Sequence, residues 1–148
     1  MIRPIETRDA AAWAAMRSRL WPFEDAVALA DEARAFVEGT GEGIVDAVFL
    51  AEDDDALPVG FLELSVRAFS DGCDSAPVPH VEGWFVEEPA RHRGLGRALV
   101  AAAEAWARER GYTELASDTE IDNEASRLAH GRLGFEEVDR LIKFRKRL

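Results

Sequence analysis

A short apolar run, followed by a glycine-containing turn and a helical pattern, constrains this chain more than any other feature. The run VEGWFV (Val81–Val86) is typical of a strand, and EEPA interrupts it before RHRGLGRAL (Arg91–Leu99). From Leu95 onward, apolar residues recur at three- and four-residue steps, the pattern of a helix face packed on a sheet. The sequence therefore predicts an α/β protein in which a strand, a turn and a helix follow one another directly.

This turn has the composition of an anion-binding site. Free backbone N–H groups at a helix start point toward an anion, and the helix dipole adds a favourable field. Gly94 and Gly96 let a ligand approach the backbone, and the arginines of the turn can add charge-assisted hydrogen bonds. Leu99 stands where the dinucleotide fingerprint has its third glycine, and the lysine of a P-loop is missing. The turn indicates a small anionic ligand, and the alternative is an ordinary solvated turn.

The spacing of apolar residues, alternating in some segments and helical in others, divides the rest of the chain into short elements. Strand-like runs occur at Ile2–Ile5, Ile44–Ala51, Val59–Val66, Val81–Val86, Leu115–Ser117 and Val138–Phe144. Helical patterns occur at Arg8–Trp21, Glu24–Val37, Leu95–Arg110 and Asn123–Leu133. The predicted order is βααβββαβαβ, and 148 residues suit a single domain over residues 1–148.

Charge and cysteine usage narrow the possible partners. Lys and Arg number 18 against 29 Asp and Glu, a net charge of −11, which repels nucleic acids and anionic membranes and attracts cations. The single cysteine, Cys73, has no disulfide partner, and the ligand cluster of a metal site is missing around it. The first residues lack the apolar core of a secretion signal, and no apolar stretch is long enough to span a bilayer. We expect a cytoplasmic protein without a metal.

Two motifs, in this order, resemble the GNAT superfamily of N-acetyltransferases. The first is R-x-x-G-x-G, filled by Arg91, Gly94 and Gly96, and the second is NEASRLAHGRLGF (Asn123–Phe135) with its L-G-F ending. The resemblance implies an α+β GNAT fold, with four helices on a mixed sheet of about six or seven strands, and acetyl-CoA as cosubstrate. The residues that it places at acetyl-CoA are Phe85, Val86, Arg91, His92, Arg93, Gly94, Leu95, Gly96, Arg97 and Asn123. For Asn123 the alternative is a plain helix cap.

A narrower resemblance, to the aminoglycoside 6'-N-acetyltransferases, is carried by LW at Leu20-Trp21, by VEGWFV, by ASD at residues 116–118 and by DN at residues 122–123. It implies an acceptor site with acidic residues at Glu82 and Asp118, and it suggests a homodimer. Trp21 could stack on a sugar face or anchor the core. Glu82 could instead face solvent, and Asp118 could merely begin a turn.

The chemistry of acetyl transfer explains why carboxylates are expected. An alkyl ammonium with a pKa of about 10.4 is only about one part in 2,500 neutral at pH 7, so a nearby proton acceptor helps. Glu82 and Asp118 are the candidates, and the sequence leaves open which of them accepts the proton. The resemblance also implies that the pantetheine arm lies along Val81–Val86, where a backbone N–H near Phe85 or Val86 would polarise the thioester carbonyl. His130 stands where many family members have a tyrosine that protonates the leaving thiolate, and a packed, inert His130 is the alternative.

These features predict an aminoglycoside 6'-N-acetyltransferase that transfers the acetyl group directly in a ternary complex and gives antibiotic resistance. One alternative is an acetyltransferase of another small amine, such as a polyamine, an amino acid or a protein N-terminus. The other is a noncatalytic acyl-CoA-binding module, which would need neither Glu82 nor Asp118.

Overall fold

A computed structural model describes residues 1–41 and 43–148 of the chain. Its strands are β1 (Ile2–Pro4), β2 (Ala47–Glu52), β3 (Pro58–Arg67), β4 (Val78–Val86) and β5 (Ala116–Ser117). Its helices are α1 (Ala10–Leu20), α2 (Ala26–Glu38), α3 (Leu95–Glu109) and α4 (Glu124–Arg132). Short 3-10 turns precede α1, at Thr7–Asp9, and α3, at Glu88–Ala90.

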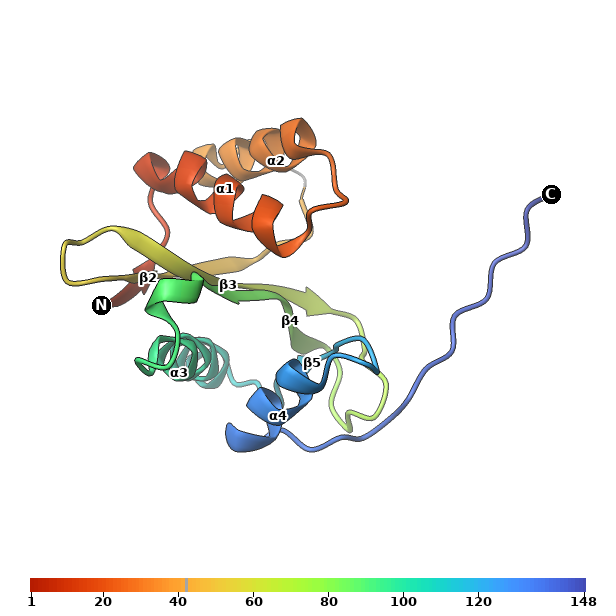
Figure 1. The fold of residues 1–148 in the computed structure, drawn as a ribbon. Helices are drawn as coiled ribbons and strands as arrows, with labels where there is room; N and C mark the ends of the chain where they lie inside the picture. Colours follow the sequence, from red (N-terminus) through yellow and green to blue (C-terminus); the bar gives the residue numbers. More distant parts are fainter. Residues whose placement is uncertain (42) are drawn as a thin grey trace.

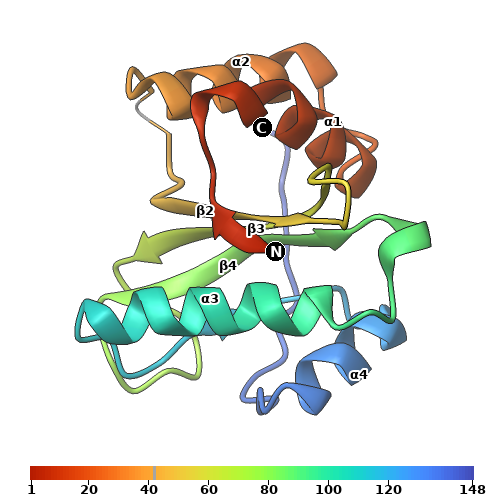
Figure 2. The ribbon, with the colours of Figure 1, turned by 90° about the vertical axis from the view of Figure 1, so that its left-hand side faces the viewer.

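The described strands form one mixed sheet covered on both faces. Its order is β1-β2-β3-β4-β5; the first four strands pair antiparallel and β5 pairs parallel to β4. Helices α1 and α2 lie on one face, and α3 and α4 on the other (Figures 1 and 2). Trp13 and Met16 of α1 pack on Phe61 in the first layer, and Leu99 of α3 packs on Leu62 in the second. The prediction of an α/β fold with four helices is confirmed.

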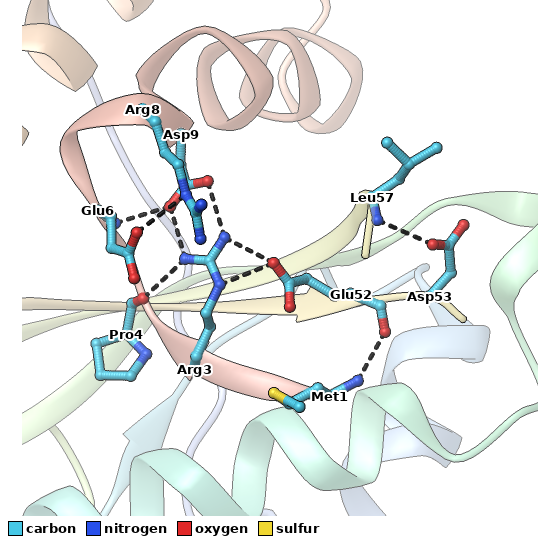
Figure 3. A network of polar contacts seen from close by, with 9 residues as sticks. All are labelled: Met1, Arg3, Pro4, Glu6, Arg8, Asp9, Glu52, Asp53 and Leu57. Atoms are coloured by element: carbon cyan, nitrogen blue, oxygen red, sulfur yellow. Dashed lines mark hydrogen bonds and ion pairs between the residues drawn. The ribbon is translucent and has the colours of Figure 1, made fainter. Parts of the chain in front are cut away.

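A buried ionic network fixes the start of α1 against the sheet (Figure 3). The Arg3 guanidinium of β1 donates to both carboxylate oxygens of Asp9, at 2.7 and 2.9 Å, and to Glu52 of β2 at 2.8 Å. The hydrogen bond from Arg3 holds the pKa of the Asp9 carboxyl below its usual value. Because both carboxylates are paired with one cation, the network can hold α1 in place without leaving an isolated buried charge.

The prediction of a last strand at Val138–Phe144 is wrong. Residues 138–144 carry no strand in the structure, and the sheet has five strands among the described residues rather than six or seven. This segment runs away from the sheet (Figure 1), with the Phe144 side chain 91% exposed. Alternating apolar residues indicate the strand conformation but not a neighbour for it, and a strand forms only when its backbone is paired. Among the described helices, none is both long and apolar enough to cross a membrane.

Candidate active site

The sheet opens between β4 and β5. These strands pair only at His80 with Ala116 and at Val81 with Ser117. Beyond Val81, among the described residues, β4 continues to Val86 with no strand on its β5 side. On the other side of β4 the register shifts, because Leu64 lies opposite Val81 while Glu63 lies opposite Gly83. Glu82 is therefore the extra residue of a β-bulge, a feature that bends a strand and redirects its side chain. The result is an unpaired strand edge beside an acidic residue.

The first turn of α3 lies against Trp84 of β4 and carries free backbone donors. Among the described residues, no backbone acceptor pairs with the N–H groups of Leu95, Gly96 and Arg97. Gly94, the N-cap, has φ +83°, a left-handed conformation that favours glycine, and a Cβ there would meet nothing within 4 Å. This arrangement suits an anion such as a pyrophosphate.

The basic residues of the turn have different environments. Arg91 Nε donates to the carbonyl oxygen of Val86 at 2.9 Å and so ties the turn to the end of β4. Arg93 pairs at 2.8 Å with a carboxylate of the β2–β3 connection, and Arg97 reaches a carbonyl oxygen at the end of α4, 3.5 Å away. His92 is exposed. Arg91 therefore shapes the turn, while exposed His92 is free to meet a ligand.

Two aromatic residues of β4 pack on opposite faces of the sheet. Phe85 lies 6.1 Å from the Phe61 ring on the α1 face, and Trp84 packs on the α3 face. A Cβ at Gly96 would lie 3.2 Å from the Trp84 indole. Gly96 therefore allows α3 to pack closely on Trp84, while its backbone N–H stays among the free donors of the turn.

His130 is half-buried and held by several contacts. Its Nδ1 lies 2.8 Å from the carbonyl oxygen of Ser126, and its Nε2 lies 2.8 Å from Ser117 Oγ. The carbonyl can only accept, so Nδ1 carries the proton and Nε2 accepts from the serine hydroxyl. The ring also makes edge contacts with Trp84 and Phe135 at 5.4 and 5.1 Å. The structure thus shows a packed His130 that is also linked to Ser117 at the opening.

Asn123 acts as a helix cap. Its side-chain oxygen accepts from the Ser126 N–H at 3.1 Å at the start of α4. This is the alternative considered in the sequence, and it orients the helix that carries His130.

An acidic pocket lies on the α1 face of the sheet. Its volume is about 230 Å³, and the residues that set its chemistry are Arg17, Trp21, Glu24, Glu32, Glu63 and Glu82. The lining has four glutamates and one arginine, and Arg67 pairs with Glu82 from outside the lining, so the acidic groups still outnumber the guanidinium groups and favour a cationic ligand. The structure brings Trp21 and Glu82 together in the lining of this pocket.

Glu82 is anchored by β3. Arg67 donates to both of its carboxylate oxygens at 2.8 Å, and the Ser65 hydroxyl donates to one of them. Burial raises the pKa of the Glu82 carboxyl, but the hydrogen bonds from Arg67 and Ser65 outweigh burial and leave the pKa below its usual value. Glu82 therefore stays ionised and suits cation binding better than proton acceptance.

Glu63 was missed by the sequence reading. Its carboxylate accepts from Trp13 Nε1 at 3.0 Å and lies 3.2 Å from Arg17 Nε. Burial raises the pKa of Glu63 to about 7 despite the guanidinium. The signal was available, because Glu63 interrupts the apolar strand FLELSV as Glu82 interrupts VEGWFV.

Trp21 packs on the core and also lines the pocket. Its ring lies 6.4 Å from the Phe61 ring and 5.3 Å from the Arg17 guanidinium. A Cβ at Gly83 would lie only 2.9 Å from Trp21 Cη2, so the indole rests on bare β4 backbone. It is anchored there and still lines the pocket.

Asp118 lies beyond the end of β5, outside the lining of this pocket. Its side chain is 77% exposed, and its Oδ2 lies 3.4 Å from Nε2 of the buried His80. The structure therefore places an imidazole next to Asp118, a neighbour that the sequence did not suggest.

Comparisons with known proteins agree with this geometry. The family model described as the acetyltransferase (GNAT) family matches residues 10–135. A Klebsiella aerogenes protein named aminoglycoside N(6')-acetyltransferase type 1 is 45% identical over 148 residues, covering 100% of this chain and 97% of that protein.

Solved structures match over the same length. The structure of AAC(6')-Iy with the bisubstrate analog CoA-S-monomethyl-acetylneamine has a TM-score of 0.88 at 35% identity, covering 100% of this chain and 98% of that one. The aminoglycoside antibiotic 6'-N-acetyltransferase AAC(6')-Ih from Acinetobacter baumannii has a TM-score of 0.84 at 32% identity, with the same coverage. Strands β4 and β5 separate, the glycine turn opens α3, and the family model matches most of the chain. The chain therefore belongs to the GNAT acetyltransferase family.

Proposed function

We propose that this chain transfers the acetyl group of acetyl-CoA to the 6'-amine of an aminoglycoside, directly in a ternary complex, and thereby gives antibiotic resistance. The observation that carries the proposal is the bulge at Glu82, where the open edge of β4 meets the acidic pocket. A relative that is 45% identical over the full length of this chain is named aminoglycoside N(6')-acetyltransferase.

The described residues fit acetyl-CoA, which would supply the thioester. The free N–H groups of the first α3 turn suit its pyrophosphate, with the side chains of His92, Arg93 and Arg97 at the rim. The unpaired edge of β4 offers backbone groups to an extended arm, and an N–H near Phe85 or Val86 would polarise the carbonyl. We assign the return of a proton to the sulfur to Ser117 and His130 acting in series, with the ring protonated on both nitrogens: the Ser117 hydroxyl gives its proton to the sulfur and takes one from His130 Nε2.

The acceptor side suits a polycation. The glutamates of the pocket and the net charge of −11 favour a molecule with several ammonium groups. We assign cation binding to Glu82, whose carboxylate is held ionised, and proton acceptance to the exposed Asp118. We assign to Trp21, which lines the pocket, stacking on a sugar face.

The test is thiol release from acetyl-CoA with kanamycin-type, gentamicin-type and polyamine acceptors. We expect rapid release with 6'-amino aminoglycosides and slow release with spermidine. Rapid release with spermidine alone would support the small-amine alternative. Acetyl-CoA binding without release for any acceptor would support a binding module instead.

Gly94→Val is expected to weaken acetyl-CoA binding at least tenfold, about 1.4 kcal/mol. A β-branched residue is strained at φ +83° and would move the N–H groups of the α3 turn. Gly39→Val, another left-handed glycine that lies at the end of α2, is the matched control and should leave binding unchanged. Wild-type affinity for acetyl-CoA in a folded Gly94→Val protein, measured by calorimetric titration, would contradict the assignment of an anion site to this turn.

We also propose that the single domain of residues 1–148 works in the cytoplasm as a homodimer, without nucleic acid or membrane partners. Support for a second copy comes from the exposed apolar tail, including Ile142 and Phe144. A groove of about 480 Å³ runs beside β5, between the start of this tail and the end of α3. The tail of one copy has the strand-like alternation to pair in the groove of another.

Light scattering tests the dimer. We expect the full chain at twice its 16.4 kDa mass, and the Ile142→Ser/Phe144→Ser variant at the mass of one chain. The matched control, Lys143→Ser/Arg145→Ser, alters the alternate positions of the tail and should remain a dimer. A full chain that runs at 16.4 kDa at high concentration would contradict the proposal.

A further inference from the structure

A buried histidine lies between the two carboxylates assigned to the acceptor. The side chain of His80 is only 2% exposed, with Nε2 3.4 Å from Asp118 Oδ2 and Nδ1 3.5 Å from Glu82 Oε1. The β3–β4 register places Ser65 directly opposite His80, so both face the acidic side of the sheet. Glu82 comes from the bulge and Asp118 from the end of β5, so the imidazole joins the two strands where they separate.

The hydrogen-bonding capacity of this imidazole does not match its surroundings. A neutral ring carries one N–H and therefore donates to only one of the two carboxylates. His80 Nδ1 is buried and has no hydrogen-bond partner among the described residues. The unpaired nitrogen faces Glu82, which already accepts from Arg67 and Ser65. Asp118 is thus the carboxylate that lacks a donor.

The charges around His80 keep its ring neutral. Burial lowers the pKa of His80, and the Arg67 guanidinium lowers it further, while Glu82 and Asp118 raise it. The net pKa lies below the usual histidine value, so the uncharged ring dominates at neutral pH.

We propose that His80 is a positioning residue, whose Nε2–H donates to Asp118 and holds that exposed carboxylate where the acceptor's ammonium group arrives. The inference rests on the proposed function. Within the described part of the chain, His80 is the sole side chain at ion-pair distance from the Asp118 carboxylate. The 3.4 Å separation exceeds that of a formed hydrogen bond, and such contacts commonly tighten when the substrate binds.

Because His80 lies between two carboxylates, its protonation at low pH should affect acceptor binding. Protonation of His80 Nδ1 creates an imidazolium between Glu82 and Asp118, which offsets their charge and opposes an incoming ammonium group. We expect kcat/KM for the aminoglycoside to fall as pH drops through the His80 ionisation, below the usual histidine value. The acetyl-CoA affinity should not follow this ionisation.

Two substitutions separate positioning from packing. His80→Phe fills the space without a donor and should lower kcat/KM for a kanamycin-type acceptor about tenfold, a loss expected for one positioned hydrogen bond to a charged group. His80→Gln places an amide N–H near the position of Nε2 and should restore most of that loss. Val78→Ala, at a fully buried position two residues earlier in β4, controls for lost packing and should lower thermal stability alone.

A double-mutant cycle with Asp118→Asn decides how His80 acts. If it acts through Asp118, His80→Phe should cost less than about twofold in the Asp118→Asn background. Equal losses in both backgrounds, or no rescue by Gln, would overturn the proposal.

Histidine NMR titration supplies a readout that does not depend on turnover. Asp118→Asn removes an anion that raises the pKa of His80, so the midpoint of the His80 ring signal should move down. An unchanged midpoint would overturn the contact. If wild-type protein acetylates no aminoglycoside, the proposed function fails, while this titration still tests whether His80 senses Asp118.

Discussion

Asp118→Asn should lower kcat/KM for a kanamycin-type acceptor by about a hundredfold or more, the range expected for loss of a general base. The amine must shed a proton before it attacks, and its protonation at pH 7 costs roughly 4–5 kcal/mol unless the site helps. Asp118 is the exposed carboxylate at the opening, and Asn keeps its size while removing its charge. Acetyl-CoA binding should stay within about twofold, because binding of that anion needs no carboxylate.

Steady-state kinetics and calorimetric titration of the same protein check this expectation. Glu120→Gln, another exposed acidic residue in the connection after β5, is the matched control and should behave as wild type. Glu82→Gln should also lower kcat/KM, chiefly by raising KM, because the ionised Glu82 is assigned to cation binding. Wild-type kinetics in both acidic-site variants would put the acceptor elsewhere.

The parts of the fold that the sequence predicted are those with a local cause. The turn at Gly94 requires a residue tolerant of positive φ, and α3 repeats its apolar face within a few turns, so both leave a mark in neighbouring residues. Glu82 was also predicted from its neighbours, because it is an acidic residue within an apolar strand. These signals need no knowledge of what lies across the sheet.

The parts that the sequence missed depend on contacts between distant residues. The segment 138–144 alternates as a strand does, but pairing depends on a neighbour that alternation does not specify. The close packing of Gly96 on Trp84 was not predicted, because the two residues belong to different elements. His80 drew no attention, since its two carboxylates meet it only where β4 and β5 separate.

A 6'-hydroxyl aminoglycoside is expected to bind but not turn over. It keeps most of the ammonium groups that the acidic pocket attracts, but it presents a hydroxyl where the amine should attack. Spermidine has the charge without the rigid sugar that would meet Trp21, so its kcat/KM should be lower by about a hundredfold or more. The pair of matched drugs therefore separates recognition of charge from placement of one amine.

The most direct measurement is thiol release with matched 6'-amino and 6'-hydroxyl aminoglycosides, with the acetylated position assigned by NMR and binding of the hydroxyl drug measured by calorimetry. The account predicts release only with the 6'-amino drug, a single product acetylated at the 6' nitrogen, and binding of the 6'-hydroxyl drug without release. Equal release with the 6'-hydroxyl drug, or acetylation at another nitrogen, would contradict the 6'-N assignment and leave the GNAT family membership intact.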